Sequence, residues 1–179
     1  MEWIVNGIVL QIIQGDITRQ DDLEAIVNAA NSSLRGGGGV DGAIHRAAGP
    51  ELKKESCALA PLRTGGAVAT GAYQLPQRFI IHCVGPVYGR DKPEERLLSD
   101  CYRNALALAE EKQIRSIGFP AISTGIYGYP LKDAAQVMLS TILKCLPGLK
   151  SLQLIRAVLF DQAACKVHCT VLEELLPKR

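Results

Sequence analysis

Strand-like and helix-like segments alternate along the chain, and this alternation restricts its possible folds more than any other feature. Runs rich in Val, Ile and Ala predict strands over 25–28, 67–70, 79–84, 115–122 and 152–160. Apolar residues at helical spacing predict helices over 40–48, 93–112, 130–146 and 164–176. Segment 3–13 predicts two strands around a tight turn at Asn6-Gly7. We therefore expect an α/β fold with helices on both faces of a mixed sheet.

Length and charge restrict the class of protein. The 179 residues suit one domain spanning 1–179, since no linker or repeat interrupts them. Twenty basic and 18 acidic residues give a net charge of +2, too balanced for a nucleic-acid or membrane partner held by bulk charge. No signal peptide or membrane-length apolar run is recognisable. We expect a cytoplasmic monomer with no nucleic-acid or membrane partner.

None of the six cysteines forms a CxxC pair. The six are Cys57, Cys83, Cys101, Cys145, Cys165 and Cys169. Their apolar neighbours predict buried, reduced thiols. A zinc site from Cys165, His168 and Cys169 on one helical face is the alternative, but it lacks a fourth ligand. We expect no metal, and we expect His168 at the surface or in a helix cap.

Two glycine-bearing segments follow predicted strands, where ligands bind in open α/β sheets. The first is the run of four glycines at 36–39, just before a predicted helix. It is either a flexible surface loop or a place where backbone amides approach an anion. The second is STGIYGYP at 123–130, either an ordinary strand-to-helix connection or a second amide-lined turn. Together the two could enclose a diphosphate.

Several polar side chains lie near the same strand ends. Asn28 and Asn31 are either loop caps or ligands for ribose hydroxyls. Asp16 either caps the following turn or accepts from an exocyclic amine. Asp41 and His45 share a helix face, either as an exposed polar pair or as a carboxylate that positions water beside an imidazole. His82, inside a predicted strand, is interpreted as structural.

Taken together, these segments resemble the macrodomain family, in its MacroD-type branch, over about residues 15–176. The matching stretches are GDIT at 15–18, IVNAAN at 26–31, GGGGVDGAIHRAAGP at 36–50, TGGAVATGAYQLP at 64–76, IIHCVGP at 80–86 and FPAISTGIYGYP at 119–130. The resemblance implies a three-layer α/β/α fold with a deep ADP-ribose cleft.

The resemblance also implies a role for each matching residue. Asp16 would bind the adenine amine with help from the Ile17 amide, and Phe160 would pack beside the adenosine. Asn28 and Asn31 would line the distal ribose, and Asp41 would lie beside its reactive position with His45 as a neighbour. The loops around the diphosphate would consist of Gly37, Gly38, Gly39 and Val40 on one side and Ser123, Thr124, Gly125, Ile126 and Tyr127 on the other.

The implied activity is hydrolysis of esters of the distal ribose, without a cofactor. Implied substrates are O-acetyl-ADP-ribose and proteins mono-ADP-ribosylated on Asp or Glu. In the hypothetical mechanism, a water between Asp41 and a substrate phosphate oxygen attacks the ester. The alternatives are a non-catalytic ADP-ribose reader, a phosphatase acting on phosphorylated ADP-ribose, and binding of RNA or poly-ADP-ribose. The last would need a basic stripe with stacking aromatics, and only 5% of the residues are aromatic.

Overall fold

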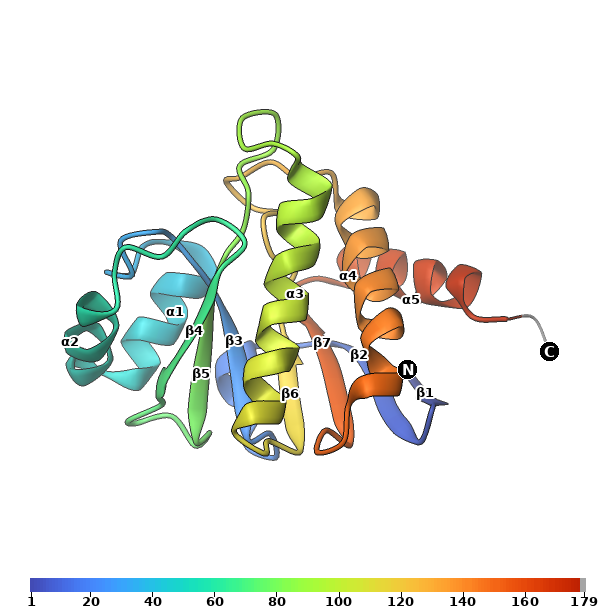
Figure 1. Cartoon of the computed structure of the whole chain (residues 1–179), viewed down its shortest axis with the longest axis horizontal. Coiled ribbons are helices and arrows are strands. Elements are labelled where there is room, and N and C mark those ends of the chain that lie inside the picture. The colour runs from blue at the N-terminus through green and yellow to red at the C-terminus, as the bar shows by residue number, and fades with distance from the viewer. Residues whose placement is uncertain (178–179) are drawn as a thin grey trace.

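Seven strands form one sheet in the order β1-β2-β7-β6-β3-β5-β4 (Figure 1). The computed structural model describes residues 1–177, and Lys178 and Arg179 lie outside the described residues. The strands are β1 (Glu2–Val5), β2 (Ile8–Gln14), β3 (Ala25–Ala30), β4 (Ala67–Gly71), β5 (Phe79–Val84), β6 (Ser116–Phe119) and β7 (Leu154–Leu159). The central strands run parallel, whereas β1 and β4 at the two edges run antiparallel to their neighbours. The predicted mixed sheet is confirmed.

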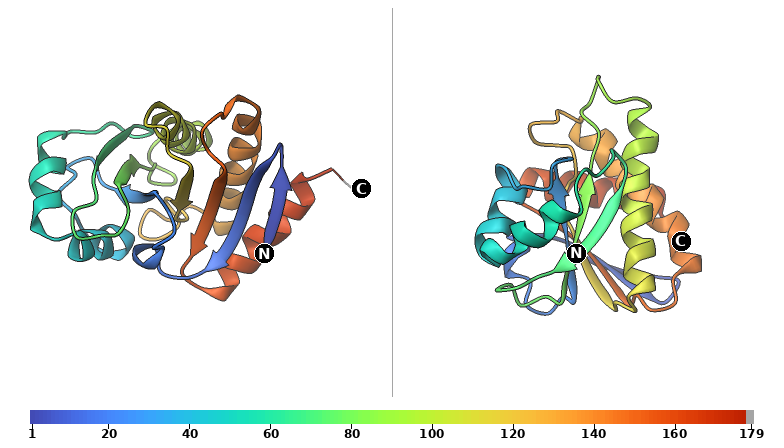
Figure 2. Two further views of the ribbon diagram at one scale, coloured as in Figure 1. Left: turned by 90° about the horizontal axis from the view of Figure 1, so that it is seen from below. Right: turned by 60° about the vertical axis from the view of Figure 1, so that its left-hand side comes forward.

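Helices cover both faces of this sheet. They are α1 (Gly39–Ala48), α2 (Pro50–Ala58), α3 (Glu94–Glu111), α4 (Leu131–Cys145) and α5 (Gln162–Leu175), with short 3-10 turns η1 (Ile17–Arg19) and η2 (Leu146–Gly148). The larger apolar cluster lies between the sheet and α3, α4 and α5. A smaller cluster packs α1, α2 and η1 against the other face. Figure 2 shows α1 and α2 on one side of the strands and α3 on the other. The predicted three-layer arrangement is confirmed.

The N-terminal hairpin forms where the sequence predicts it. Asn6 and Gly7 have φ angles of 50° and 77°. Positive φ at both central residues is the requirement of the type I′ turn, whose twist matches that of the two flanking strands. The turn sets the register in which Val5 lies opposite Ile8, and β2 then pairs in parallel with β7.

Replacing Gly7 with alanine is expected to lower the free energy of unfolding by about 1 kcal/mol, because a side chain disfavours a left-handed backbone. No described atom lies within 4 Å of the position of the added Cβ, so a steric clash contributes nothing. Urea denaturation measures the change. Gly7→Asn is the matched control and should lose less, since Asn tolerates this conformation. Equal losses for the two variants would contradict the explanation.

The structure corrects several predicted elements, among them β6, which spans Ser116–Phe119 rather than 115–122. Helix α2 was absent from the prediction: Gly49 at φ 88° ends α1, and Pro50 begins a new helix at its first position. Strand β3 continues to Ala30, two residues beyond the predicted end, so Asn28 lies inside the sheet. Helix α5 begins at Gln162 rather than at 164, because the Asp161 side chain accepts from the Ala164 N–H and caps it.

The prediction for His168 is wrong. Its side chain is buried in α5, with Nδ1 2.8 Å from the Ala164 carbonyl oxygen. Burial lowers the pKa of this imidazole. Within residues 1–177, no group of three or more His, Cys, Asp and Glu side chains is arranged to hold a metal ion. None of the helices in that range combines the length and the apolar character needed to cross a membrane.

Candidate active site

The loops that follow the parallel strands meet at the carboxyl edge of the sheet, near the top of Figure 1 for β3, β5 and β6. Each predicted site residue lies in or beside one of these loops, except Asn28. That residue lies in β3 itself, fully buried. Its side chain therefore reaches the site from within the sheet.

Asp41 lies in the first turn of α1, and its buried carboxylate is held by Asn28. Asn28 Nδ2 donates to Asp41 Oδ1 at 2.8 Å. Burial raises the pKa of the Asp41 carboxyl, while the hydrogen bond from Asn28 and the proximity of His45 oppose the rise. A carboxylate in this setting is a stronger base than one in water.

His45 accompanies Asp41 on the same helix face, as the spacing predicts. Its Nε2 lies 3.4 Å from Asp41 Oδ1, although the two atoms lack hydrogen-bond geometry. Burial lowers the pKa of this imidazole, which is therefore neutral near pH 7. Since both side chains are largely buried, the interpretation as an exposed polar pair is wrong.

The glycine run lies directly beside the Asp41 carboxylate. Gly37, Gly38 and Gly39 are exposed, and α1 begins at Gly39, which has a φ of 57°. No side chain among the described residues caps this helix start at Gly38. A Cβ on Gly37 would lie 3.3 Å from Asp41 Oδ2, so the loop passes close to the carboxylate. The amides of this helix start are thus presented beside Asp41.

Asn31 ties the glycine run to the end of β3. Its Nδ2 donates to the Gly36 carbonyl oxygen at 3.2 Å, and its Oδ1 accepts from the Ser33 N–H at 3.1 Å. Asn31 therefore caps the loop that follows β3. The Asn31 amide also lies close to Gly37, because a Cβ added at Gly37 would lie 3.6 Å from Asn31 Nδ2.

The second loop, between β6 and α4, is held in an uncommon conformation. Ser123 has a φ of 67°, and its buried Oγ has no hydrogen-bond partner among the described residues. Gly85, just after β5, packs so closely on this hydroxyl that a Cβ there would overlap it. Thr124 Oγ1 donates to the Ala121 carbonyl oxygen at 2.8 Å. The positive φ and the unpaired buried hydroxyl of Ser123 make this loop a candidate functional segment.

The exposed end of the second loop is clamped by the neighbouring loop. The Tyr88 N–H donates to the Tyr127 carbonyl oxygen at 2.9 Å, and the Tyr88 ring packs on that of Tyr129. Ile126, which precedes Tyr127, is 94% exposed, an unusual state for a large apolar side chain. The loop thus presents Gly125, Ile126 and Tyr127 at the molecular surface.

A third group lies at the ends of β2 and β7. Asp16 Oδ1 accepts from the Thr18 N–H at 2.8 Å and from Thr18 Oγ1 at 2.7 Å, so Asp16 caps the turn η1. These hydrogen bonds lower the pKa of the Asp16 carboxyl. Ile17 is buried against α1, whereas Phe160 is 89% exposed. An aromatic ring in that state is available to a flat ligand.

The family comparison decides the identity of this fold. The Macro domain family matches residues 27–138, which include most of β3, the glycine run and the second loop. The chain belongs to the macrodomain family. The resemblance read from the sequence is thereby confirmed, together with the fold that it implies.

Relatives of this macrodomain include named enzymes. An "O-acetyl-ADP-ribose deacetylase" of Salmonella typhimurium is 47% identical over 171 residues, covering 92% of this chain and 94% of that protein. A "Macro domain-containing protein" of Methanosarcina mazei is 45% identical over 168 residues, covering 93% and 89%. The first supports the MacroD-type assignment.

Solved macrodomain structures are also similar to this chain, both in sequence and in fold. The Oceanobacillus iheyensis macrodomain with ADP has a TM-score of 0.93 at 46% identity, covering 98% of this chain and 95% of that one. The Trypanosoma brucei macrodomain in complex with ADP-ribose has a TM-score of 0.84 at 41% identity, covering 90% and 68%.

The sequence did not reveal one residue close to the macrodomain site. His82 is fully buried in β5, directly opposite Asn28 in the register of the two strands. Its Nδ1 lies 3.1 Å from Asn28 Nδ2, and its Nε2 lies 2.9 Å from Thr70 Oγ1. Alternation along β5 could have placed His82 on the same sheet face as Ile80, but the pairing with β3 requires the structure.

Lowering the pH is expected to destabilise the macrodomain through His82. Burial lowers the pKa of its imidazole to about 4. Below the unfolded-state pKa of about 6.5, the unfolded chain takes up a proton that the folded chain takes up only near pH 4. The contribution of His82 to the free energy of unfolding is therefore at its full value above pH 6.5. Below that pH, the free energy of unfolding falls by up to about 1.4 kcal/mol per pH unit. Urea denaturation over this range measures the slope.

His82→Asn removes the titrating ring and is the reference for that experiment. Its free energy of unfolding is expected to decline less steeply with falling pH than that of the wild type. Parallel declines would show that His82 is accessible to protons in the folded state.

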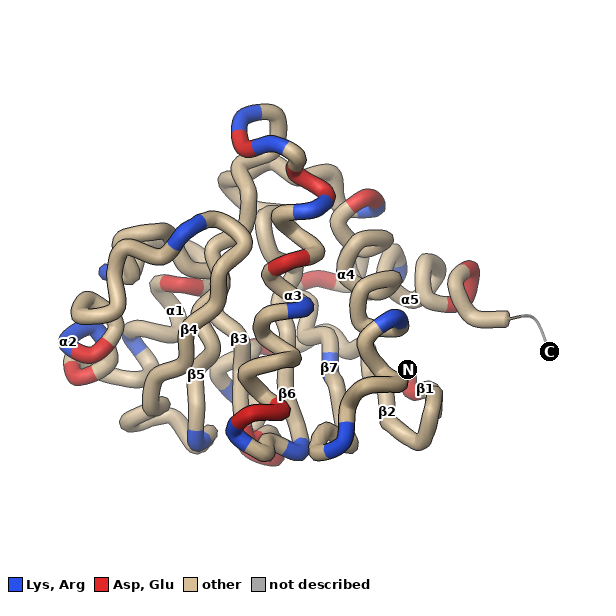
Figure 3. The backbone as a smooth tube through the Cα atoms, in the orientation of Figure 1, with Lys and Arg blue, Asp and Glu red and all other residues tan. Residues whose placement is uncertain are grey.

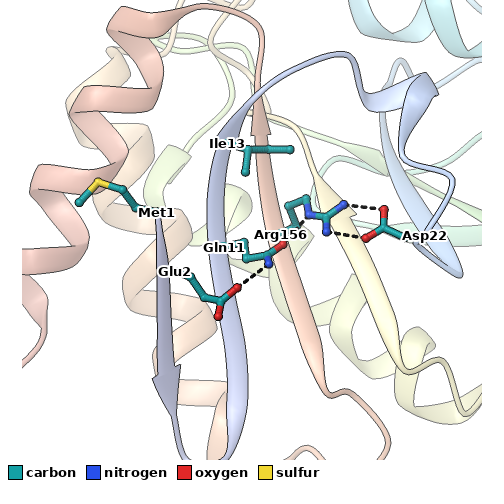
Figure 4. Close-up of a pocket in the computed structure, with 6 residues that line it drawn as sticks. All are labelled: Met1, Glu2, Gln11, Ile13, Asp22 and Arg156. Carbon is teal, nitrogen blue, oxygen red and sulfur yellow. Dashed lines mark hydrogen bonds and ion pairs between the residues drawn. The ribbon is translucent and has the colours of Figure 1, made fainter.

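A separate hollow of about 430 Å³ lies on the sheet face beside β1, β2 and β7 (Figure 4). Its lining consists of Met1, Glu2, Gln11, Ile13, Asp22 and Arg156. Arg156 forms two hydrogen bonds to the Asp22 carboxylate, and its Nε donates to Gln11 Oε1. None of these six residues is a predicted site residue. The Arg156 guanidinium already donates to acceptors of the protein itself, Gln11 and Asp22.

Proposed function

We propose that this macrodomain binds ADP-ribose and hydrolyses esters of its distal ribose. The observation that carries the proposal is the buried Asp41 carboxylate, held by Asn28 and facing the exposed amides of the glycine run. A carboxylate with a raised pKa next to an anion-binding helix start suits activation of water beside a bound phosphate. The deacetylase relative at 47% identity supports the same reaction.

In this proposal, backbone amides hold the diphosphate. Gly37 to Val40 contribute the start of α1, and Ser123 to Tyr127 contribute the strained loop on the other side. Amides and the helix dipole carry no net charge, so they explain how a chain with 20 basic and 18 acidic residues binds a dianion. The exposed Ile126 packs over the bound diphosphate.

The adenosine lies at the ends of β2 and β7. Asp16 accepts from the adenine amine, and the Ile17 amide donates to the ring. The exposed Phe160 ring covers the adenosine. At the other end, Asn31 contacts the distal ribose, while Asn28 acts on the ribose through Asp41 because it is fully buried.

The reaction follows from the position of Asp41. A water between Asp41 and a substrate phosphate oxygen attacks the carbonyl carbon of the ester. The bond from that carbon to the ribose oxygen breaks, and the ribose oxygen takes up a proton, giving a carboxylic acid and ADP-ribose. His45, neutral near pH 7, lines this site. Placement of water and ester supplies much of the rate.

Release of acetate from O-acetyl-ADP-ribose, measured beside calorimetric titration with ADP-ribose, tests the proposal. Turnover together with binding supports the hydrolase. Tight binding without turnover, also on a protein modified on Asp or Glu, would leave a non-catalytic reader. Absence of both would mean that the fold has acquired another ligand.

The proposal also covers the protein substrates, the oligomeric state and the cellular location of this macrodomain. We infer that mono-ADP-ribosylated proteins are substrates, since their Asp and Glu linkages are also esters of the distal ribose. One macrodomain over 1–179, acting as a monomer in the cytoplasm, is consistent with a single continuous sheet and with cysteines that remain free thiols. Gel filtration and fractionation of cells test these points.

A further inference from the structure

A row of buried polar side chains runs through the sheet to Asp41. It begins at Thr70 in β4, passes through His82 in β5 and Asn28 in β3, and ends at Asp41 in α1. All four side chains are more than nine-tenths buried. Their surroundings on this sheet face are otherwise apolar, and include Ile26 and Ile80. Polar groups so placed need defined partners.

The hydrogen atoms in this row can be assigned from one end. With its single hydrogen directed to the Gly71 carbonyl oxygen at 3.0 Å, Thr70 Oγ1 accepts from His82 Nε2 at 2.9 Å. The His82 ring is buried and neutral, so a proton on Nε2 leaves Nδ1 as an acceptor. Asn28 Nδ2 then donates one hydrogen to His82 Nδ1 and the other to Asp41 Oδ1.

We propose that Thr70 and His82 are positioning residues for ester hydrolysis, which fix the amide of Asn28 with its nitrogen towards Asp41. This inference rests on the proposed function. In the opposite orientation, the Asn28 oxygen would face the Asp41 carboxylate and repel it. Held as observed, Asn28 engages Oδ1 and leaves Oδ2 on the side of Gly37, where the attacking water is placed.

His45 is a titratable neighbour of the row at its Asp41 end. Its ring centroid lies 6.3 Å from that of His82, and its Nε2 lies 3.4 Å from Asp41 Oδ1. His45 forms no hydrogen bond with either residue among those described. The orientation of Asn28 therefore depends on His82 and Thr70 rather than on His45.

Thr70→Val tests the proposal, since valine keeps the shape of threonine but cannot accept from His82. We expect kcat for O-acetyl-ADP-ribose to fall about tenfold, with the Kd for ADP-ribose changed less than about twofold. Thr70→Ser restores the hydroxyl and is expected to recover most of the rate. Thr141→Val, which removes a buried hydroxyl of α4 bonded to Ser99 in α3, is the matched control and should leave kcat unchanged.

A spectroscopic measurement covers the case in which Thr70→Val fails to fold. The ¹⁵N spectrum of the wild-type histidines should show His82 protonated on Nε2 alone. A proton on Nδ1 would overturn the proposal, as would a Thr70→Val enzyme with wild-type kcat. A wild type without any turnover would overturn the proposed function as well, and the ¹⁵N spectrum would still report whether the row is ordered as inferred.

Discussion

Replacing Asp41 with alanine is expected to reduce acetate release from O-acetyl-ADP-ribose by about 10²- to 10⁴-fold, the usual effect of losing a group that assists proton transfer. Asn28 cannot substitute for it, because its amide nitrogen can only donate towards this position. Binding of ADP-ribose should survive, because backbone amides hold the diphosphate.

The matched control for Asp41→Ala is Glu51→Ala. Glu51 is likewise an acidic residue in the first turn of a helix, but it is exposed and paired with Lys54. It should keep full turnover. The loss of the carboxylate leaves a buried Asn28 N–H unpaired, so Asp41→Ala is expected to be less stable than the wild type. Thermal denaturation is therefore needed to show that the variant is folded at the assay temperature. Wild-type turnover in Asp41→Ala would remove the main support for the mechanism.

Replacing Gly42 with alanine is expected to weaken ADP-ribose binding at least about tenfold and to lower the free energy of unfolding by about 1–3 kcal/mol. Inside a helix, this substitution normally stabilises by roughly 0.5–1 kcal/mol. Here the added Cβ would overlap the Gly37 carbonyl oxygen, which is backbone and cannot rotate away. The glycine run must shift, and with it the amides that face the diphosphate.

Gly148→Ala is the control for Gly42→Ala. No described atom lies within 4 Å of a Cβ at Gly148, which lies in η2. Its free energy of unfolding should stay within about 0.5 kcal/mol of the wild type, and calorimetry should show unchanged binding. If Gly42→Ala were as stable as the wild type and bound ADP-ribose equally well, the position of the glycine run would not depend on α1.

Much of the site could be predicted because its signals are local. Four successive glycines before a helix indicate an amide-lined start, and the four-residue spacing of Asp41 and His45 places them on one helix face. The positions of strand ends then predict where such segments meet. Each inference needs only neighbouring residues and the periodicity of a helix or strand.

The residues that escaped prediction depend on pairing between distant segments. His82 acts on Asn28 only because β3 and β5 are adjacent in a register that no local pattern specifies. Strand β3 was predicted to end at Asn28, since asparagine is disfavoured in strands. Bonds to Asp41 and His82 compensate for that preference. Helix α2 was overlooked because Gly49-Pro50 usually ends a helix, whereas here it ends one and begins another.

The order of the strands has a consequence for how the chain is made. Beyond the hairpin, β2 pairs with β7, and its inward residues Ile8, Leu10 and Ile12 belong to the cluster under α4 and α5. A nascent chain on the ribosome therefore leaves one edge of β2 unpaired until β7 has emerged. This side of the sheet closes only when synthesis is nearly complete. A truncation before residue 154 would leave the hairpin without a partner, and such an edge favours aggregation.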